Sequence, residues 1–191
     1  MGTRGAYGFY KKGVNKITYN HFDSYFSGLG EEIVDFCRNT TIEDMNKIFD
    51  KIILVKADDR PTLEDIENYI EYSELKVGEQ TLQDWYCLLR DTQGNLEEYK
   101  KENVRHMIDD KEFLGNSLFC EYAYIINLTT NKLEIYTGFN ERPTKNRYAK
   151  YRDLKNNGGY YECKLVHSFD LTDIPKNWIK ILNKKNKKEE G

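Results

Sequence analysis

Two strands joined by a short turn can be recognised in the second half of the chain, and they constrain the fold more than any other feature. Leu118–Leu128 is an apolar, aromatic run, and Lys132–Phe139 carries apolar residues at largely alternating positions. Thr129-Thr130-Asn131 lies between them and is typical of a turn. The pattern predicts a β-hairpin. Its apolar face must be buried against a second layer of structure.

A second hairpin is expected at the beginning of the chain. Thr3–Tyr10 reads as a strand and Lys16–Asp23 as its antiparallel partner, because side chains of the second run alternate between two faces. The turn Lys11–Asn15 contains glycine and asparagine, which tolerate positive φ. Tyr160–Phe169 reads as a fifth strand.

Helical spacing fills the region between the hairpins. The expected helices are Leu29–Arg38, one beginning after Thr41, Leu63–Tyr72 and Leu82–Arg90, with short additional helices at Leu96–His106 and Trp178–Leu182. The sequence therefore predicts an α+β fold, in which an antiparallel sheet of about five strands packs against a layer of about four helices. We expect residues 1–183 to form a single domain and residues 184–191 a basic, disordered tail.

Composition excludes several classes of protein. No run is long and apolar enough for a membrane span or a secretory signal, so a cytoplasmic protein without membrane contact is expected. The four cysteines, Cys37, Cys87, Cys120 and Cys163, lie far apart among apolar neighbours and are expected to be buried free thiols. They are not grouped with the three histidines, so neither a metal site nor a cofactor is predicted.

Six residues near the first hairpin form the candidate catalytic site: Thr3, Arg4, Asn20, His21, Asp23 and Ser24. His21 and Asp23 are two residues apart on a strand, so they would share a face and could form an oriented general base. Gly28-Leu29-Gly30 follows and leads into a helix, whose free N–H groups attract anions. The alternative is that Asn, Asp and Ser form a hydrogen-bonded turn.

Thr3 offers a second kind of chemistry. A threonine at a processed chain start can act as a nucleophile, with its own α-amine as the base. Removal of Met1 would leave Gly2 in front of it, so a further cut would be required. The alternative interpretation makes Thr3 a strand residue and pairs Arg4 with a carboxylate such as Asp23.

A basic, aromatic stretch is the candidate nucleic-acid-binding site, with Arg142, Lys145, Arg147, Tyr148, Lys150 and Arg152. Cations interleaved with tyrosines can neutralise phosphates and stack on bases. Between Arg142 and Lys164 there are 7 basic and 2 acidic residues, whereas between Glu31 and Asp84 there are 15 acidic and 6 basic residues. The alternative is that both regions are ordinary solvated faces and loops.

Two segments carry a resemblance to a known group of proteins. The first is Thr3-Arg4-Gly5, Tyr7-Gly8, Tyr19-Asn20-His21-Phe22-Asp23-Ser24-Tyr25 and Gly28-Leu29-Gly30, and the second is Glu121–Leu128 with Leu133–Phe139. Together they resemble small, poorly characterised phage and prophage proteins, with Phe26 standing where a proline is expected. Some proteins similar to these act as anti-CRISPR proteins against type II-A systems.

The resemblance implies an accessory protein of a phage or mobile element that inhibits a host defence ribonucleoprotein, with Cas9 and its guide RNA as the partner. The alternative function is hydrolysis at the end of the first hairpin. The substrate would be an amide if Thr3 is freed, as in N-terminal-nucleophile hydrolases, or RNA if His21 is a general base. A binding module without chemistry is a third possibility.

Overall fold

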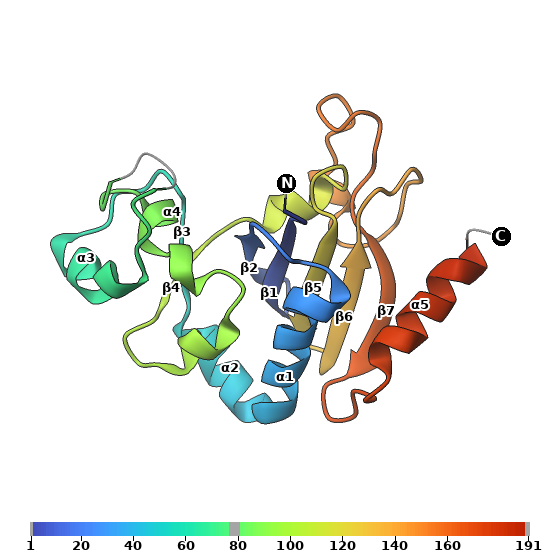
Figure 1. Ribbon diagram of the computed structural model, residues 1–191, viewed down its shortest axis with the longest axis horizontal. Helices are drawn as coiled ribbons and strands as arrows, with labels where there is room; N and C mark the ends of the chain where they lie inside the picture. The colour runs from blue at the N-terminus through green and yellow to red at the C-terminus, as the bar shows by residue number, and fades with distance from the viewer. Residues whose placement is uncertain (1, 77–80, 190–191) are drawn as a thin grey trace.

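The protein is built around a five-stranded sheet with the strand order β2-β1-β5-β6-β7, seen near the centre of Figure 1. The computed structural model describes residues 2–76 and 81–189. The strands of this sheet are β1 (Gly5–Lys11), β2 (Val14–Asn20), β5 (Tyr122–Asn127), β6 (Lys132–Thr137) and β7 (Lys164–Asp170). They correspond to the two predicted hairpins and the predicted fifth strand, and the α+β class is confirmed.

The sheet is mixed, so the prediction of a purely antiparallel sheet is wrong. β1 pairs antiparallel with β2 but parallel with β5, and Gly5 lies opposite both Asn20 and Tyr122. A short turn can join only antiparallel neighbours, whereas a parallel pair needs a long connection. The helical region between β2 and β5 supplies this connection. Local alternation reveals each hairpin but not the direction in which the two hairpins meet.

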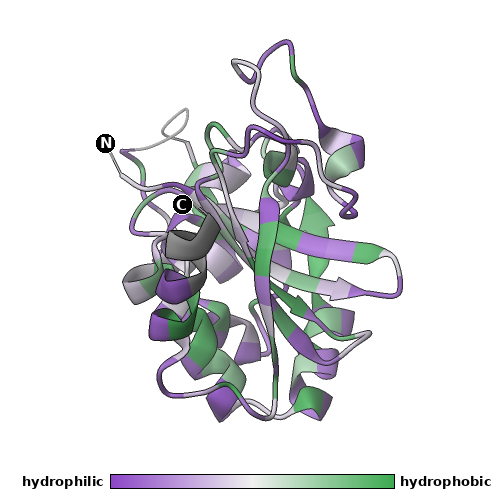
Figure 2. Cartoon of the chain, turned by 90° about the vertical axis from the view of Figure 1, so that its right-hand side faces the viewer, coloured by the Kyte–Doolittle hydropathy of each residue, from purple (hydrophilic) through white to green (hydrophobic). Residues whose placement is uncertain are grey.

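Both faces of the sheet are covered. On one face, buried side chains such as Tyr7 and Tyr124 pack with the helices. On the other face, Ala6, Ala123 and Tyr136 pack under the segments that flank β5–β7. Figure 2 shows hydrophobic stretches, in green, on the strands and on the helices beside them, together with hydrophilic stretches, in purple, on both. Because β1 and β5 are buried on both faces, they are nearly continuous in apolar and aromatic residues.

The helices are α1 (Glu31–Asn39), α2 (Ile42–Lys51), α3 (Leu63–Tyr69), α4 (Trp85–Leu88) and α5 (Trp178–Glu189). Thr41 and Thr62 cap α2 and α3, since their side chains accept hydrogen bonds from Asp44 N and Asp65 N, whereas α4 is capped by Asp84. The helix expected from Leu82 is shorter than predicted. The segment expected to form a helix over Leu96–His106 forms a 3₁₀ turn at Leu96–Lys100 and then ends in a strand.

That strand belongs to a small second sheet, which the sequence did not predict. β3 (Ile53–Val55) and β4 (His106–Ile108) pair in parallel, and each is too short to show an alternating pattern. Together with α3 and α4 they form a lobe beside β2, on the left of Figure 1. The backbone N–H of Asp110 donates to the carbonyl of Ile17 at 2.8 Å, which ties this lobe to the edge of the main sheet.

The last helix, α5, runs beside β7 and packs Trp178 and Leu182 into the core. It continues to Glu189, through most of the segment for which a disordered tail was expected, and residues 190 and 191 lie outside the described chain. All four cysteines are buried and free, as predicted. Among the described helices, none combines the length and apolarity needed to cross a lipid bilayer.

Candidate functional site

The strand register aligns one end of every strand, so that these ends lie side by side at one end of the main sheet. Asn20, Gly5, Tyr122, Thr137 and Lys164 lie opposite one another in a row across the sheet. The residues just outside this row, 2–4, 21–25, 119–121 and 138–142, are called the rim below. Five of the predicted catalytic residues lie on the rim, and the sixth, Asn20, lies in the row beside it. They come from the beginning of β1 and the end of β2, which run in opposite directions.

Asn20 and Ser24 are buried and hold the chain together rather than facing an opening. The Asn20 side-chain amide donates to Ser24 Oγ at 2.8 Å and to the Phe22 carbonyl at 2.6 Å. The Ser24 carbonyl accepts a hydrogen bond from the Tyr124 hydroxyl at 2.9 Å, and its N–H donates to the Thr3 carbonyl at 3.1 Å. Asn20 and Ser24 therefore form part of the hydrogen-bonded turn of the alternative interpretation, and no hydrogen bond within the described chain involves the Asp23 side chain.

His21 and Asp23 do not form the expected pair. β2 ends at Asn20, and Asp23 has a φ of +53°, so the two-residue alternation of the strand no longer applies beyond this point. His21 Nδ1 instead lies 3.0 Å from the Tyr19 hydroxyl. Both His21 and Asp23 are exposed on the rim.

Arg4 faces β5 and not the first hairpin. Its backbone N–H donates to Glu121 Oε1 at 3.2 Å, and its guanidinium lies over the Phe119 ring, 4.6 Å from the centroid. The ion pair with Asp23 that the alternative interpretation offers is not formed among the described residues. Arg4 Nε is buried without a hydrogen-bond partner in the described chain. Thr3 beside it is half-buried.

Arg90 is a site residue that the sequence did not indicate. It follows α4 in the helical lobe, and its guanidinium lies over the rings of Phe22 and Tyr86 at 5.6 and 5.7 Å. Burial lowers the pKa of His21, and the positive charges of Arg90 and Arg4 lower it further. Both effects favour the neutral form of the imidazole. No local pattern around Arg90 gives a signal, because only the packing of the lobe beside β2 brings it here.

Gly28 and Gly30 lie where neighbouring atoms leave no room for a side chain. A Cβ atom on Gly30 would lie 2.8 Å from the Trp178 ring and 2.9 Å from the Tyr124 hydroxyl. A Cβ on Gly28 would lie 2.2 Å from the Asp23 carbonyl oxygen. The glycines thus let η1 (Phe26–Gly30) approach the sheet and α5.

Four large apolar side chains are exposed on the rim: Phe22 at 53%, Tyr25 at 39%, Phe119 at 37% and Phe139 at 55%. They come from segments that are far apart in the sequence, and strand register gathers them on one edge. Phe139 has a φ of +51°, an uncommon value for an aromatic residue, and its N–H is held by the Ser117 carbonyl at 2.7 Å. Apolar side chains gathered on one surface indicate a contact site.

A groove of about 750 Å³ runs along part of the rim. Glu121, Phe139, Arg142 and Lys164 line it together with apolar residues of β5 and β7. The groove therefore combines an exposed ring with charges of both signs. Among the predicted nucleic-acid-binding residues, Arg142 is the one that lines it.

Three of the predicted nucleic-acid-binding residues are engaged inside the protein. Arg147 pairs with Glu134 and lies over the Tyr10 ring at 4.0 Å, while Tyr148 is buried and its hydroxyl lies 3.2 Å from Asn15 Oδ1. Neither side chain is therefore presented to an external phosphate.

Arg152 is engaged in the same way. Its Nε and Nη2 donate to the two carboxylate oxygens of Glu162 at 2.6 and 3.0 Å. Burial alone would raise the pKa of Glu162, but the hydrogen bonds from Arg152 and Thr144 outweigh it and hold the pKa at about 2. The exposed members of the predicted set are Arg142, Lys145 and Lys150.

Within residues 2–76 and 81–189, no group of three histidine, cysteine or acidic side chains is arranged to hold a metal ion. In comparisons with known proteins, no family model matches the chain, and neither a curated protein nor a solved structure matches it.

Proposed function

We propose that this protein is a binding protein that attaches through its rim to a host defence ribonucleoprotein and inhibits it. The observation that carries the proposal is the set of four exposed aromatic side chains on one sheet edge, with the guanidinium groups of Arg4 and Arg90 over two of them. Exposed rings stack on unpaired bases, and guanidinium groups bind phosphate oxygens and stack on rings. Such a surface suits the exposed RNA of a ribonucleoprotein.

The resemblance to phage and prophage accessory proteins makes Cas9 with its guide RNA the first partner to test. Two arrangements on the rim favour binding over hydrolysis. Ser24 is fully buried, and His21 is hydrogen-bonded to Tyr19 rather than to a carboxylate that would orient it as a base. The rim therefore offers contact area and charge without a completed acid–base pair.

Co-purification with several Cas9 orthologues loaded with guide RNA, followed by DNA cleavage assays, tests the proposal. We expect binding by at least one loaded orthologue and slower cleavage of its target. Phe119→Ala and Phe139→Ala should each weaken binding about tenfold, as expected for loss of one stacking contact. Leu63→Ala, at a side chain 81% exposed and outside the rim, is the matched control and should bind normally. No binding and no inhibition across the orthologues would refute the proposal.

RNA hydrolysis is the second candidate, and one observation favours it. His21 is largely exposed, and its partial burial together with the charges of Arg90 and Arg4 lowers its pKa. A neutral imidazole can remove a proton from a ribose hydroxyl, and arginines stabilise the negative charge that develops on the phosphate. Incubation of guide RNA with wild type and His21→Ala separates this reaction from simple binding. Cleavage by wild type that His21→Ala abolishes supports it, whereas intact RNA with wild type refutes it.

A further inference from the structure

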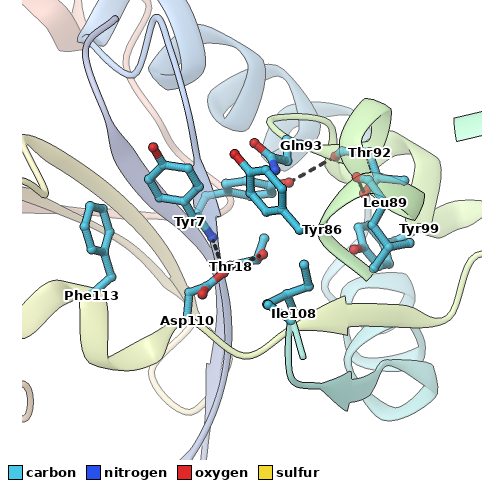
Figure 3. A pocket seen from close by; sticks show the side chains of 12 residues that line it. Tyr7, Thr18, Tyr86, Leu89, Thr92, Gln93, Tyr99, Ile108, Asp110 and Phe113 are labelled. Atoms are coloured by element: carbon cyan, nitrogen blue, oxygen red, sulfur yellow. Dashed lines mark hydrogen bonds between the residues drawn. The ribbon is translucent and has the colours of Figure 1, made fainter. Parts of the chain in front are cut away.

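A pocket of about 100 Å³ lies between the edge of β2 and the helical lobe, and it shares no residue with the rim. Figure 3 shows Thr18 on β2, Ile108 and Asp110 at the end of the small sheet, and Tyr86, Leu89 and Gln93 from the segment around α4. The site is thus formed only when the lobe is packed against the main sheet.

Asp110 places a carboxylate in this pocket. Tyr19 N–H and the Thr18 hydroxyl both donate to its Oδ2, at 3.0 and 3.3 Å. In the part of the chain that the structure describes, no hydrogen bond is formed to Oδ1 and no cation pairs with this carboxylate. The neighbouring Asp109, in contrast, forms an ion pair with Lys111.

Aromatic rings form much of the wall around this carboxylate. Tyr19 packs edge to face on Phe113, with centroids 5.2 Å apart, and both line the pocket with Tyr86. Arg90 lies at the wall of the pocket, over the Tyr86 ring, and donates to Gln93 Oε1 at 2.6 Å, but among the described residues it forms no ion pair with Asp110. A partly buried carboxylate surrounded by rings is a favourable environment for an organic cation, because the rings attract cations through their faces.

We propose that this pocket binds a small organic cation, a primary ammonium or guanidinium head group, with Asp110 as its counter-ion. A pocket of about 100 Å³ has room for a group of a few heavy atoms, and a guanidinium has four. The burial that raises the pKa of Asp110 is the same burial that strengthens its attraction for a bound cation.

The same head group can come from two sources, a free amine or guanidine, or a lysine or arginine side chain of another protein. Calorimetric titration with methylguanidinium and butylammonium tests the shared chemistry, and methylurea is the uncharged control. We expect saturable binding of one or both cations and none of methylurea. A short peptide with a central arginine, amidated and acetylated at its ends, separates the sources. Tighter binding of the peptide than of methylguanidinium indicates a protein side chain, and weaker binding indicates a free small molecule.

Asp110→Asn keeps an oxygen for the Tyr19 N–H but removes the charge, so it should weaken cation binding at least tenfold. Asp109→Asn is the matched control, because it removes a neighbouring charge that Lys111 already neutralises, and it should bind the cation within about twofold of wild type. Equal binding by Asp110→Asn and wild type, or no saturable binding of either cation by wild type, would overturn the proposal.

A second variant keeps the test decisive if Asp110→Asn does not fold. Tyr86→Leu retains an apolar wall but removes the ring, and it should weaken binding severalfold while thermal unfolding stays close to that of wild type. Unchanged binding by a folded Tyr86→Leu protein would refute the aromatic part of the site. The rim variants Phe119→Ala and Phe139→Ala leave this pocket intact, so failure of ribonucleoprotein binding and failure of cation binding are distinguished.

Discussion

Arg152 and Glu162 form a two-point ion pair in which the carboxylate is completely buried and both of its oxygens accept from the guanidinium. The Thr144 N–H donates to the same carboxylate at 2.8 Å. The pair therefore fixes the segment before β7 across ten residues of chain. It uses two residues of a stretch that looks, from its composition, like an external basic surface.

Replacement of Glu162 should destabilise the protein strongly. Glu162→Gln leaves the Arg152 guanidinium without its counter-ion, and loss of one partner of a buried pair costs about 3 kcal/mol or more. Urea unfolding followed by tryptophan fluorescence measures the change. Asp153→Asn is the matched control, since Asp153 is exposed, and it should change the free energy of unfolding by less than about 0.5 kcal/mol. Equal stabilities of the two variants would contradict the structural role assigned to the pair.

The ionised Glu162 carboxylate should contribute less to the free energy of unfolding as the pH falls. The pKa of Glu162 is about 2 in the folded protein and lies below its ordinary value, so its contribution is complete above that ordinary value and is lost as the pH falls toward 2. Each pKa unit of difference corresponds to about 1.4 kcal/mol. The stability difference between wild type and Glu162→Gln should therefore narrow by about 2 kcal/mol between about pH 6 and about pH 3. A difference that is constant with pH would argue against an ionised, buried Glu162.

Ser24→Ala separates a structural serine from a catalytic one. The change removes the acceptor for the Asn20 amide within a buried turn, so the free energy of unfolding should fall by about 1 kcal/mol. Any RNA cleavage by the protein should be unaffected in the folded fraction. Calorimetric unfolding and a cleavage assay below the unfolding transition measure the two effects. A fully stable variant without activity would make Ser24 a reacting group instead.

The pKa of His21 should lie below 6.5 and should depend on Arg90. Burial is the largest cause of the lowered pKa, and the Arg90 guanidinium is the next. Arg90→Gln removes that charge, so the pKa of His21 should rise toward its ordinary value. NMR titration of the histidine ring protons measures this, with the His21 signal assigned from its loss in His21→Ala. Arg142→Gln is the control and should leave the titration unchanged, because Arg142 is not among the charges acting on His21.

The elements that the sequence predicts well are those with a local pattern. Alternation marks both hairpins, and Thr41 and Thr62 mark the starts of α2 and α3. The parallel pairing of β1 with β5 has no local pattern, because it depends on how the helical region returns the chain to the sheet. The three-residue strands β3 and β4 are too short for any periodicity to be read.

The candidate site was predicted in the same uneven way. Arg4 and His21 lie at the same end of the first hairpin, as expected, because the pairing of β1 with β2 places the start of one strand beside the end of the other. The burial of Ser24 and the arrival of Arg90 depend on packing between distant segments. The sequence does not show whether an arginine is paired inside the fold or exposed. Arg152 therefore could not be distinguished from Arg142, because its partner Glu162 is brought to it only by folding.

The pairing of β1 with β5 also has a consequence for the order of events during synthesis. Arg4 and Glu121, which bond to each other, are 117 residues apart, so the first hairpin leaves the ribosome long before its neighbour in the sheet exists. Until then one side of β1 has no strand to pair with, and an unpaired strand edge invites association with other chains. A nascent chain released before residue 127 should therefore be the aggregation-prone species, and the sheet should become protected only after β5 has been made.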